Sequence, residues 1–198
     1  MNIVCLDLEG VLIPEIWLGV AELTGEPRLQ KTTRDIPIYD ELMRYRLGIL
    51  DELGIGIDVI QSVIDQLEPL PGAPEFLDAL RSRYQVAILS DTFYEFAMPL
   101  MAKLDHPFLL CHRLDIEDGR IADYRLRQPD PKRAAVKAFH SLRYRVTAAG
   151  DSYNDVAMLE EADAGIFFSA PDNVLAEFPQ YPHAQSYEAL TELIESVQ

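Results

Sequence analysis

Two carboxylates follow the first apolar run of the chain at a spacing that suits divalent-cation or phosphate chemistry. The run from Ile3 to Leu6 is followed by Asp7 and then by Glu9 and Gly10. An extended backbone would project the Asp7 and Glu9 side chains to the same side, and Gly10 would let the backbone turn closely around whatever they hold. The alternative is a solvated strand end with a turn glycine, and this segment alone does not decide between the two.

The remaining polar candidates occupy similar positions, at the end of a predicted strand or the start of a predicted helix: Ser90, Asp91, Lys132, Asp151, Asn154 and Asp155. Apolar runs over 85–89 and 145–149 predict the two strands. A helix over 130–142 would place Lys132 in its first turn. Because the helix dipole disfavours a cation there, Lys132 needs an anion or a carboxylate as a neighbour.

The elements that would position these residues alternate between helix and strand after residue 71. This alternation predicts an α/β fold with a parallel sheet flanked by helices, and the carboxyl ends of such strands form the ligand-binding edge. Three prolines and a glycine over 69–74 mark a domain boundary. We therefore expect a core of 1–13 and 71–198, with residues 14–70 inserted as a small helical domain.

Other local patterns predict how the chain turns between these elements. A helix over 93–104 contains Pro99, which should end it early or kink it. The tetrapeptide at 117–120 predicts a hairpin turn between two strands. The polar residues 26–38 are predicted to form a connecting segment.

The helical insertion carries two charged residues with two interpretations each. Glu15 lies in the first turn of a helix predicted to begin at Pro14, where the helix dipole alone favours an acid. Arg46 falls within the apolar stripe of a helix over 39–53. The stripe consists of Leu42, Ile49, Leu50 and Leu53. An arginine there either serves a functional site or lays its stem on the core and extends its head into water.

Composition limits the class of partner. The 198-residue chain has a formal net charge of -16 and a pI near 4.5, which argues against nucleic acid or an anionic membrane as a partner. It has no apolar run of the roughly 18 residues needed to span a bilayer, and it lacks the pattern of a signal peptide, so we expect a cytoplasmic protein. Cys5 and Cys111 are flanked by apolar residues and are predicted to be buried thiols, and the spacing of the histidines does not suggest metal ligands.

Taken in order, these residues resemble the four motifs of the haloacid dehalogenase-like hydrolases. The matching segments are Asp7-Leu8-Glu9, Ser90, Lys132 and the loop 150–155. The match covers nearly the whole chain, and it implies a Rossmann-like core with a helical-bundle cap inserted after the first motif, as in the phosphoserine phosphatase branch. Within that branch the chain is most similar to bifunctional enzymes that act as phosphoserine phosphatases and homoserine phosphotransferases.

The resemblance implies Mg²⁺-dependent phosphoryl transfer from phosphoserine through an aspartyl phosphate on Asp7. Asp7, Asp151 and the backbone carbonyl of Glu9 would hold Mg²⁺, with Asp155 supporting the site. The Glu9 side chain would be the general acid and base, although most of the superfamily has the shorter Asp at this position. Lys132 would balance the charge of Asp7 and the phosphate.

The resemblance also implies how the substrate is held. Ser90 would donate to a phosphoryl oxygen, and Asn154 would contact substrate or phosphate. Glu15 would bind the ammonium group, and Arg46 would bind the carboxylate through its guanidinium fork. Asp91 stands where phosphoserine phosphatases usually carry glycine, and a carboxylate there either binds the amine or points away from the phosphate.

Two other functions compete with this prediction. A receiver-like signalling domain also places acids, a hydroxyl and a lysine around Mg²⁺, but such domains lack a helical insertion after the first strand. A phosphatase for another small phosphomonoester is the second alternative. The sequence leaves open whether water or an alcohol is the acceptor, and whether the protein is a monomer or a homodimer.

Overall fold

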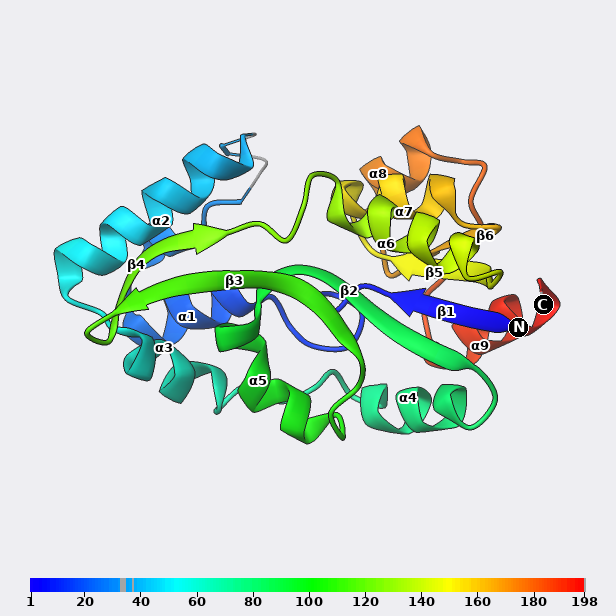
Figure 1. Ribbon diagram of the computed structural model, residues 1–198, viewed down its shortest axis with the longest axis horizontal. Coiled ribbons are helices and arrows are strands. Elements are labelled where there is room, and N and C mark those ends of the chain that lie inside the picture. Colours follow the sequence, from blue (N-terminus) through cyan, green and yellow to red (C-terminus); the bar gives the residue numbers. More distant parts are fainter. Residues whose placement is uncertain (33–34, 37, 198) are drawn as a thin grey trace.

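The chain folds around one twisted sheet. The computed structural model describes residues 1–32, 35–36 and 38–197. In that part of the chain the strands are β1 (Asn2–Leu6), β2 (Gln85–Phe93), β3 (Leu109–Glu117), β4 (Arg120–Arg125), β5 (Arg145–Gly150), β6 (Ala164–Phe168) and β7 (His183–Ala184). They form a seven-stranded sheet in the order β4-β3-β2-β1-β5-β6-β7, which is parallel except for the β3–β4 pair (Figure 1).

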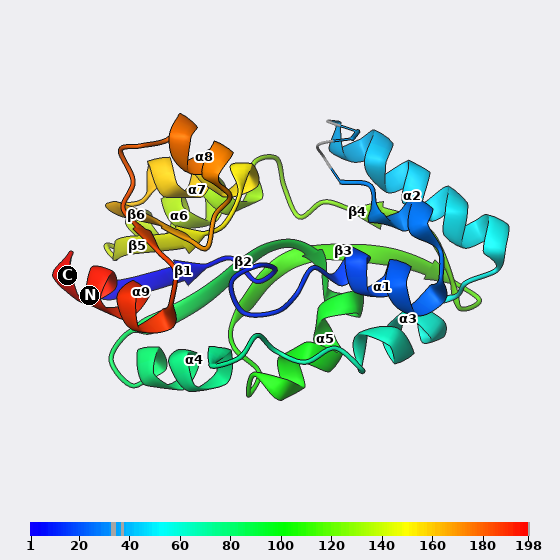
Figure 2. The same cartoon turned by 180° about the vertical axis from the view of Figure 1, so that it is seen from behind.

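Helices cover both faces of the sheet, as the sequence predicts. They are α1 (Ile16–Thr24), α2 (Tyr39–Leu53), α3 (Ile57–Ile64), α4 (Ala73–Arg81), α5 (Tyr94–Lys103), α6 (Pro131–Ser141), α7 (Val156–Glu161), α8 (Asp172–Glu177) and α9 (Tyr187–Ser196), with short 3₁₀ turns at Pro27–Gln30 and Tyr153–Asp155. Figures 1 and 2 show α6 and α7 on one face and α4 and α5 on the other. Among the described residues, every helix is too short or too polar to cross a bilayer.

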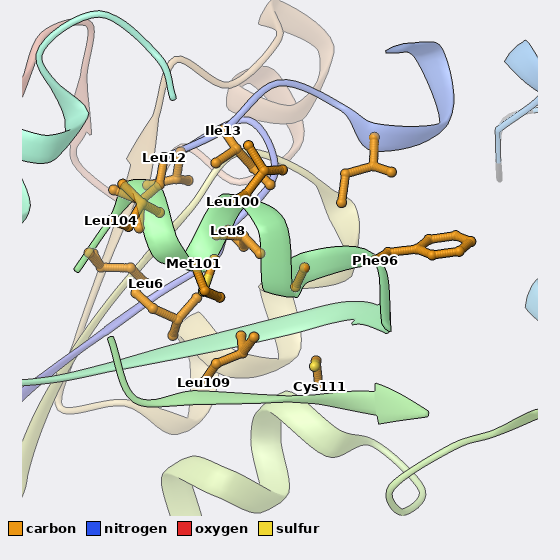
Figure 3. Close-up of a cluster of buried hydrophobic side chains, with 14 of the residues drawn as sticks. Leu6, Leu8, Leu12, Ile13, Phe96, Leu100, Met101, Leu104, Leu109 and Cys111 are labelled. Atoms are coloured by element: carbon orange, nitrogen blue, oxygen red, sulfur yellow. The ribbon is translucent and has the colours of Figure 1, made fainter. Parts of the chain in front are cut away.

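The buried apolar side chains of the described residues form two hydrophobic clusters, one on each face of the sheet. The smaller cluster joins β1, β2 and β5 to α6 and α7. The larger one packs α5 against β1, its following loop and β3, and Figure 3 shows Leu6, Leu100 and Leu109 within it. This larger cluster continues without interruption into α1, α2 and α3. The predicted division into a core and a cap of residues 14–70 stays a prediction, because the helical insertion shares its apolar core with α5.

The predicted end of β2 is wrong. The strand continues past Leu89 to Phe93, and its register against β3 shifts between these two residues. Phe93 is buried and pairs with His112 of β3, which keeps the chain extended beyond the apolar run. Ser90 therefore lies in the irregular part of the strand and not after its end.

The expected early end of the helix at Pro99 is also wrong, because α5 continues through it to Lys103, whereas the alternative of a kink stays a prediction. A proline in this position leaves the carbonyl of Glu95, four residues earlier, without its usual helical donor. The side-chain amide of Gln61, on α3, donates to that carbonyl at 2.9 Å. A long-range contact thus supplies the hydrogen bond that the proline removes.

The other local predictions are confirmed with small shifts. The hairpin turns at Asp118 and Gly119, whose φ angles of 48° and 80° are those of a tight hairpin turn. Both cysteines are buried free thiols. On α2, Leu53 is 44% exposed and Met43 is buried instead, because Leu53 is the final helical residue before the left-handed Gly54. The predicted connecting segment contains a 3₁₀ turn, and its residues 33, 34 and 37 lie outside the described residues.

Candidate active site

A cavity of about 360 Å³ opens between the carboxyl ends of β1, β2 and β5 and the helices α1 and α2. Most of the predicted site residues line it: Asp7, Glu9, Glu15, Arg46, Ser90, Asp91, Asp151 and Asn154. The other two, Lys132 and Asp155, lie directly behind Asp7. The structure therefore brings all of the predicted residues together, from segments up to about three quarters of the chain apart.

Lys132 is the centre of the acidic part of the site. Its ammonium lies 2.7 Å from Asp155, 3.0 Å from Asp7 and 3.6 Å from Asp91, and the side chain is only 3% exposed. Burial alone would lower the pKa of Lys132, but these carboxylates raise it well above its usual value. The lysine that opposes its helix dipole thus has the carboxylate partners that the sequence required.

The carboxylates outnumber this single cation. Asp7, Asp151 and Asp155 each offer an oxygen within 4.8 Å of the others. Burial, followed by repulsion from Asp155, raises the pKa of Asp7 well above its usual value and that of Asp151 to about 7. A bound divalent cation would relieve this repulsion, and hard carboxylate oxygens are the ligands that Mg²⁺ prefers.

The three carboxylates differ in how many of their oxygens are available to such a cation. Asp155 uses one oxygen for Lys132, and the other accepts the backbone N–H groups of Asp151 and Ser152 at 2.9 and 3.1 Å. In Asp7, both the backbone N–H of Leu8 and Lys132 contact Oδ1. Among the described contacts, Oδ2 of Asp7 and the Asp151 carboxylate are therefore the oxygens best placed for a metal ion, and Asp155 supports them.

The absence of a side chain at Gly10 lets the Asp151 carboxylate lie against the backbone. A Cβ atom at Gly10 would lie 2.4 Å from Oδ2 of Asp151, and the φ angle of Gly10 is +76°. Both the close approach and the left-handed backbone require glycine. The predicted close turn around the site is confirmed.

Ser90, Asp91 and Asn154 form the wall beside Lys132. The Ser90 hydroxyl oxygen accepts the backbone N–H of Thr92 at 3.2 Å, which leaves its proton for another acceptor. Asn154 donates its side-chain amide to Asp91 at 3.0 Å. Burial would raise the pKa of Asp91, but Lys132, His112 and Asn154 lower it well below its usual value.

Glu9 and Glu15 face each other across the start of α1. The helix begins at Ile16, two residues later than predicted, so Glu15 is its N-terminal flanking residue, and Glu9 accepts the backbone N–H of Ile16 at 2.9 Å. Burial, followed by repulsion from Glu15, raises the pKa of Glu9 to about 8. The Glu9 side chain is thus directed toward the helix, and metal binding by its backbone carbonyl stays a prediction.

Arg46 closes the far side of the cavity, and its head is buried. The side chain is 7% exposed, and its guanidinium lies 4.5 Å from the ring centre of Trp17 and donates to the carbonyl of Lys31 at 2.8 Å. The alternative in which the head reaches water is therefore wrong. Burial lowers the pKa of Arg46 to about 10, so it stays charged at neutral pH. Its Nε is buried without a hydrogen-bond partner among the described residues.

Three aromatic residues at or near the cavity were not predicted. Trp17 supports the Arg46 guanidinium, Tyr39 donates to the carbonyl of Asp91 at 3.0 Å, and His112 lies behind Asp91. Trp17 and Tyr39 fall in predicted helices, and His112 falls in a predicted strand run, where aromatic residues are ordinary core components. The sequence pattern therefore does not distinguish these three residues from ordinary core residues.

Comparisons with known proteins agree with this geometry. A family model described as haloacid dehalogenase-like hydrolase matches residues 1–163. A Pseudomonas aeruginosa protein named phosphoserine phosphatase ThrH is 62% identical over 191 residues, which span 96% of this chain and 93% of that protein. A phosphoserine phosphatase of Pseudomonas syringae is 61% identical over 191 residues, or 96% of this chain and 81% of that protein.

Solved structures agree at the level of the fold. A crystal structure of a phosphoserine phosphatase in its apo form aligns with a TM-score of 0.80 at 21% identity, over 100% of this chain and 99% of that one. At that identity the likeness shows the fold alone. With a family model over most of the length and a relative above 60% identity, the chain belongs to the haloacid dehalogenase-like hydrolases.

Proposed function

We propose that the protein is an Mg²⁺-dependent phosphoserine phosphatase that can also transfer the phosphoryl group of phosphoserine to homoserine. One observation carries the proposal: a single cavity holds the Asp7–Lys132 pair at one end and the buried Arg46, with its unpartnered Nε, at the other. The first arrangement suits a phosphoryl group, and the second suits a carboxylate. The names of the two Pseudomonas relatives support the same substrate.

In the proposed reaction Asp7 is the nucleophile. The oxygen of its carboxylate that does not hold the metal ion attacks phosphorus, the bond between phosphorus and the serine oxygen breaks, and an aspartyl phosphate forms. Glu9 gives a proton to the departing serine oxygen. Glu9 then takes a proton from water or from the homoserine hydroxyl as that oxygen attacks phosphorus, which releases Asp7 as a carboxylate.

The charge that builds on the phosphoryl oxygens is met from three sides. Lys132 and the free hydroxyl proton of Ser90 are the donors from the protein. Mg²⁺, held by Asp7 and Asp151 with Asp155 behind them, would neutralise part of the phosphoryl charge. Lys132 also opposes the rise in the pKa of Asp7 that burial and Asp155 cause, which favours the ionised form needed for attack.

The rest of the substrate extends toward α1 and α2. Arg46 would bind the substrate carboxylate, Glu15 would bind the ammonium group, and Asn154 would contact the substrate at the rim. The cavity volume of about 360 Å³ suits a small molecule. We expect neither nucleic acid nor a membrane as a partner, because the chain carries a net charge of -16.

The second candidate is a phosphatase for another small phosphomonoester. It shares the Asp7–Lys132 end of the cavity and would make no use of the buried guanidinium. A substrate survey separates the two, because a carboxylate-dependent enzyme would prefer phosphoserine over phosphoethanolamine, which lacks the carboxylate.

The proposal is tested by incubating the protein with phosphoserine and Mg²⁺, with and without homoserine, while free phosphate and phosphohomoserine are measured together. We expect phosphohomoserine to appear as free phosphate falls, because both acceptors draw on one aspartyl phosphate. If homoserine does not change the release of free phosphate, the proposed transfer to homoserine is wrong. Activity that survives metal chelation, or an absence of phosphate release from phosphoserine, would overturn the main assignment.

A further inference from the structure

His112 lies outside the cavity, yet its ring is fixed in one hydrogen-bonding state. The residue is on β3 and is only 2% exposed. Its Nδ1 lies 3.1 Å from the backbone nitrogen of Arg127, whose N–H can only donate. Nδ1 is therefore the acceptor, and the neutral ring carries its proton on Nε2.

That Nε2 proton faces Asp91. Nε2 lies 3.7 Å from Oδ1 of Asp91, and the rings of Phe93 and Tyr39 pack against the imidazole at centroid distances of 6.2 and 6.4 Å. Tyr39 also donates its hydroxyl to the backbone carbonyl of Asp91 at 3.0 Å. Asp91 is thus held at its side chain by His112, which lies outside the cavity, and at its backbone carbonyl by Tyr39, which lines the cavity.

The other oxygen of Asp91 faces the reacting end of the site. Oδ2 accepts the side-chain amide of Asn154 at 3.0 Å and lies 3.6 Å from the ammonium of Lys132. Lys132 in turn contacts Asp7 at 3.0 Å. A continuous series of polar contacts therefore runs from His112 through Asp91 to Lys132 and the proposed nucleophile.

We propose that His112 is a positioning residue for phosphoryl transfer, which orients Asp91 so that Asp91 holds Lys132 and Asn154 in place. This inference rests on the proposed function of the site and assigns Asp91 to the support of Lys132 and not to the binding of a substrate amine. A residue that acts in this way changes the turnover step more than substrate affinity, because Lys132 meets charge that develops on the phosphoryl group.

Two polar substitutions of similar size separate this role from packing. His112→Asn keeps an oxygen near the Arg127 N–H but is too short to reach Asp91, whereas His112→Gln places an amide N–H near the position of Nε2. We expect kcat for phosphoserine to fall about 10-fold in His112→Asn with KM changed less than about 2-fold, and to stay within about 3-fold in His112→Gln. His183→Gln, at the exposed position of β7, is the matched control.

A double substitution tests whether His112 acts through Asp91. The His112→Asn/Asp91→Asn variant should be no slower than Asp91→Asn alone, because removing Asp91 also removes the path to Lys132. The inference would be overturned if the losses of kcat in the two single variants multiplied in the double variant. It would also be overturned by equal losses in His112→Asn and His112→Gln, or by an unchanged kcat in His112→Asn. Thermal unfolding of each variant separates lost folding from lost turnover. If the wild-type protein releases no phosphate from phosphoserine, the proposed function itself fails, which is distinguishable from unchanged variants of an active enzyme.

Discussion

The two ends of the cavity differ in which charged groups they carry in excess. At the sheet edge, three carboxylates contact the ammonium of Lys132, a fourth, Asp151, lies beside Asp7 and Asp155, and backbone N–H groups hold Asp7 and Asp155 in place. At the helical end, the guanidinium of Arg46 rests on an aromatic ring with one nitrogen unpartnered. The first end has an excess of anionic groups, and the second has an unused donor.

This difference points to separate tasks. An excess of carboxylates suits a cation and a phosphoryl group, whose charges change during the reaction, so substitutions there should act on turnover. An unpartnered buried donor suits the substrate carboxylate, whose charge does not change during the reaction. Substitutions there should therefore act on substrate selection. Substitutions at the two ends of the cavity test that separation.

Asp7→Asn should lower phosphate release from phosphoserine by about 10³-fold or more, because an amide cannot form the aspartyl phosphate. Burial and neighbouring carboxylates raise the pKa of Asp7, so its charge is unfavourable in the fold and the neutral amide should not lower the unfolding temperature in EDTA. Released phosphate and thermal unfolding check both parts. Asp172→Asn, at an exposed position of α8, is the control, and turnover of Asp7→Asn within 10-fold of the wild type would contradict the role of Asp7.

Arg46→Lys should raise KM for phosphoserine by about 100-fold, because a lysine cannot offer the bidentate fork to a carboxylate. The rate with phosphoethanolamine, which has no carboxylate, should change little. Steady-state kinetics with both substrates measure the ratio. Arg44→Lys, two residues away on the exposed side of α2, should leave both unchanged. Equal losses on the two substrates would break the proposed separation of tasks.

Gly10→Ala should lower kcat about 10-fold, because the new methyl group would push the Asp151 carboxylate from its position. It should also lower the free energy of unfolding by about 1–2 kcal/mol, through strain at positive φ. Gly25→Ala is a sharp control, since Gly25 has a φ of +70° and open space around it. Gly25→Ala should lower the free energy of unfolding and leave kcat unchanged. An unchanged kcat in Gly10→Ala would show that the reaction tolerates displacement of Asp151.

Trp17→Leu should raise KM for phosphoserine about 3-fold, since the cation–π contact with Arg46 is worth about 0.5–1 kcal/mol. Trp17→Phe keeps a ring beneath the guanidinium and should show a smaller rise. Steady-state kinetics distinguish the two. Equal effects would mean that Trp17 serves packing against Phe96, whose ring lies 5.4 Å from it, more than support of Arg46.

Much of the sheet edge was predictable because it depends on local order along the chain. An apolar run predicts a strand, and the residue that follows the run lies at the strand end, as Asp7 does after β1 and Asp151 does after β5. The dipole argument at Lys132 predicts a carboxylate partner without saying which one. These inferences need no knowledge of distant neighbours.

The parts that were missed depend on contacts between distant segments. The Gln61 side chain lets α5 continue through Pro99, and pairing with His112 extends β2 to Phe93. In each case the local pattern favours an ending, and a group far away in sequence supplies the hydrogen bond or the packing that prevents it. Local periodicity does not encode which distant group that is.

The sequence by itself determined the α/β fold, the order of the strand-end acids and the lysine that must neutralise them, because each follows from spacing and helix electrostatics. Only the tertiary structure decided that Arg46 is buried on Trp17 and that His112 stands behind Asp91. An arginine on an apolar stripe and a histidine in a strand each have several stable environments. The partners that three-dimensional packing brings beside them select one.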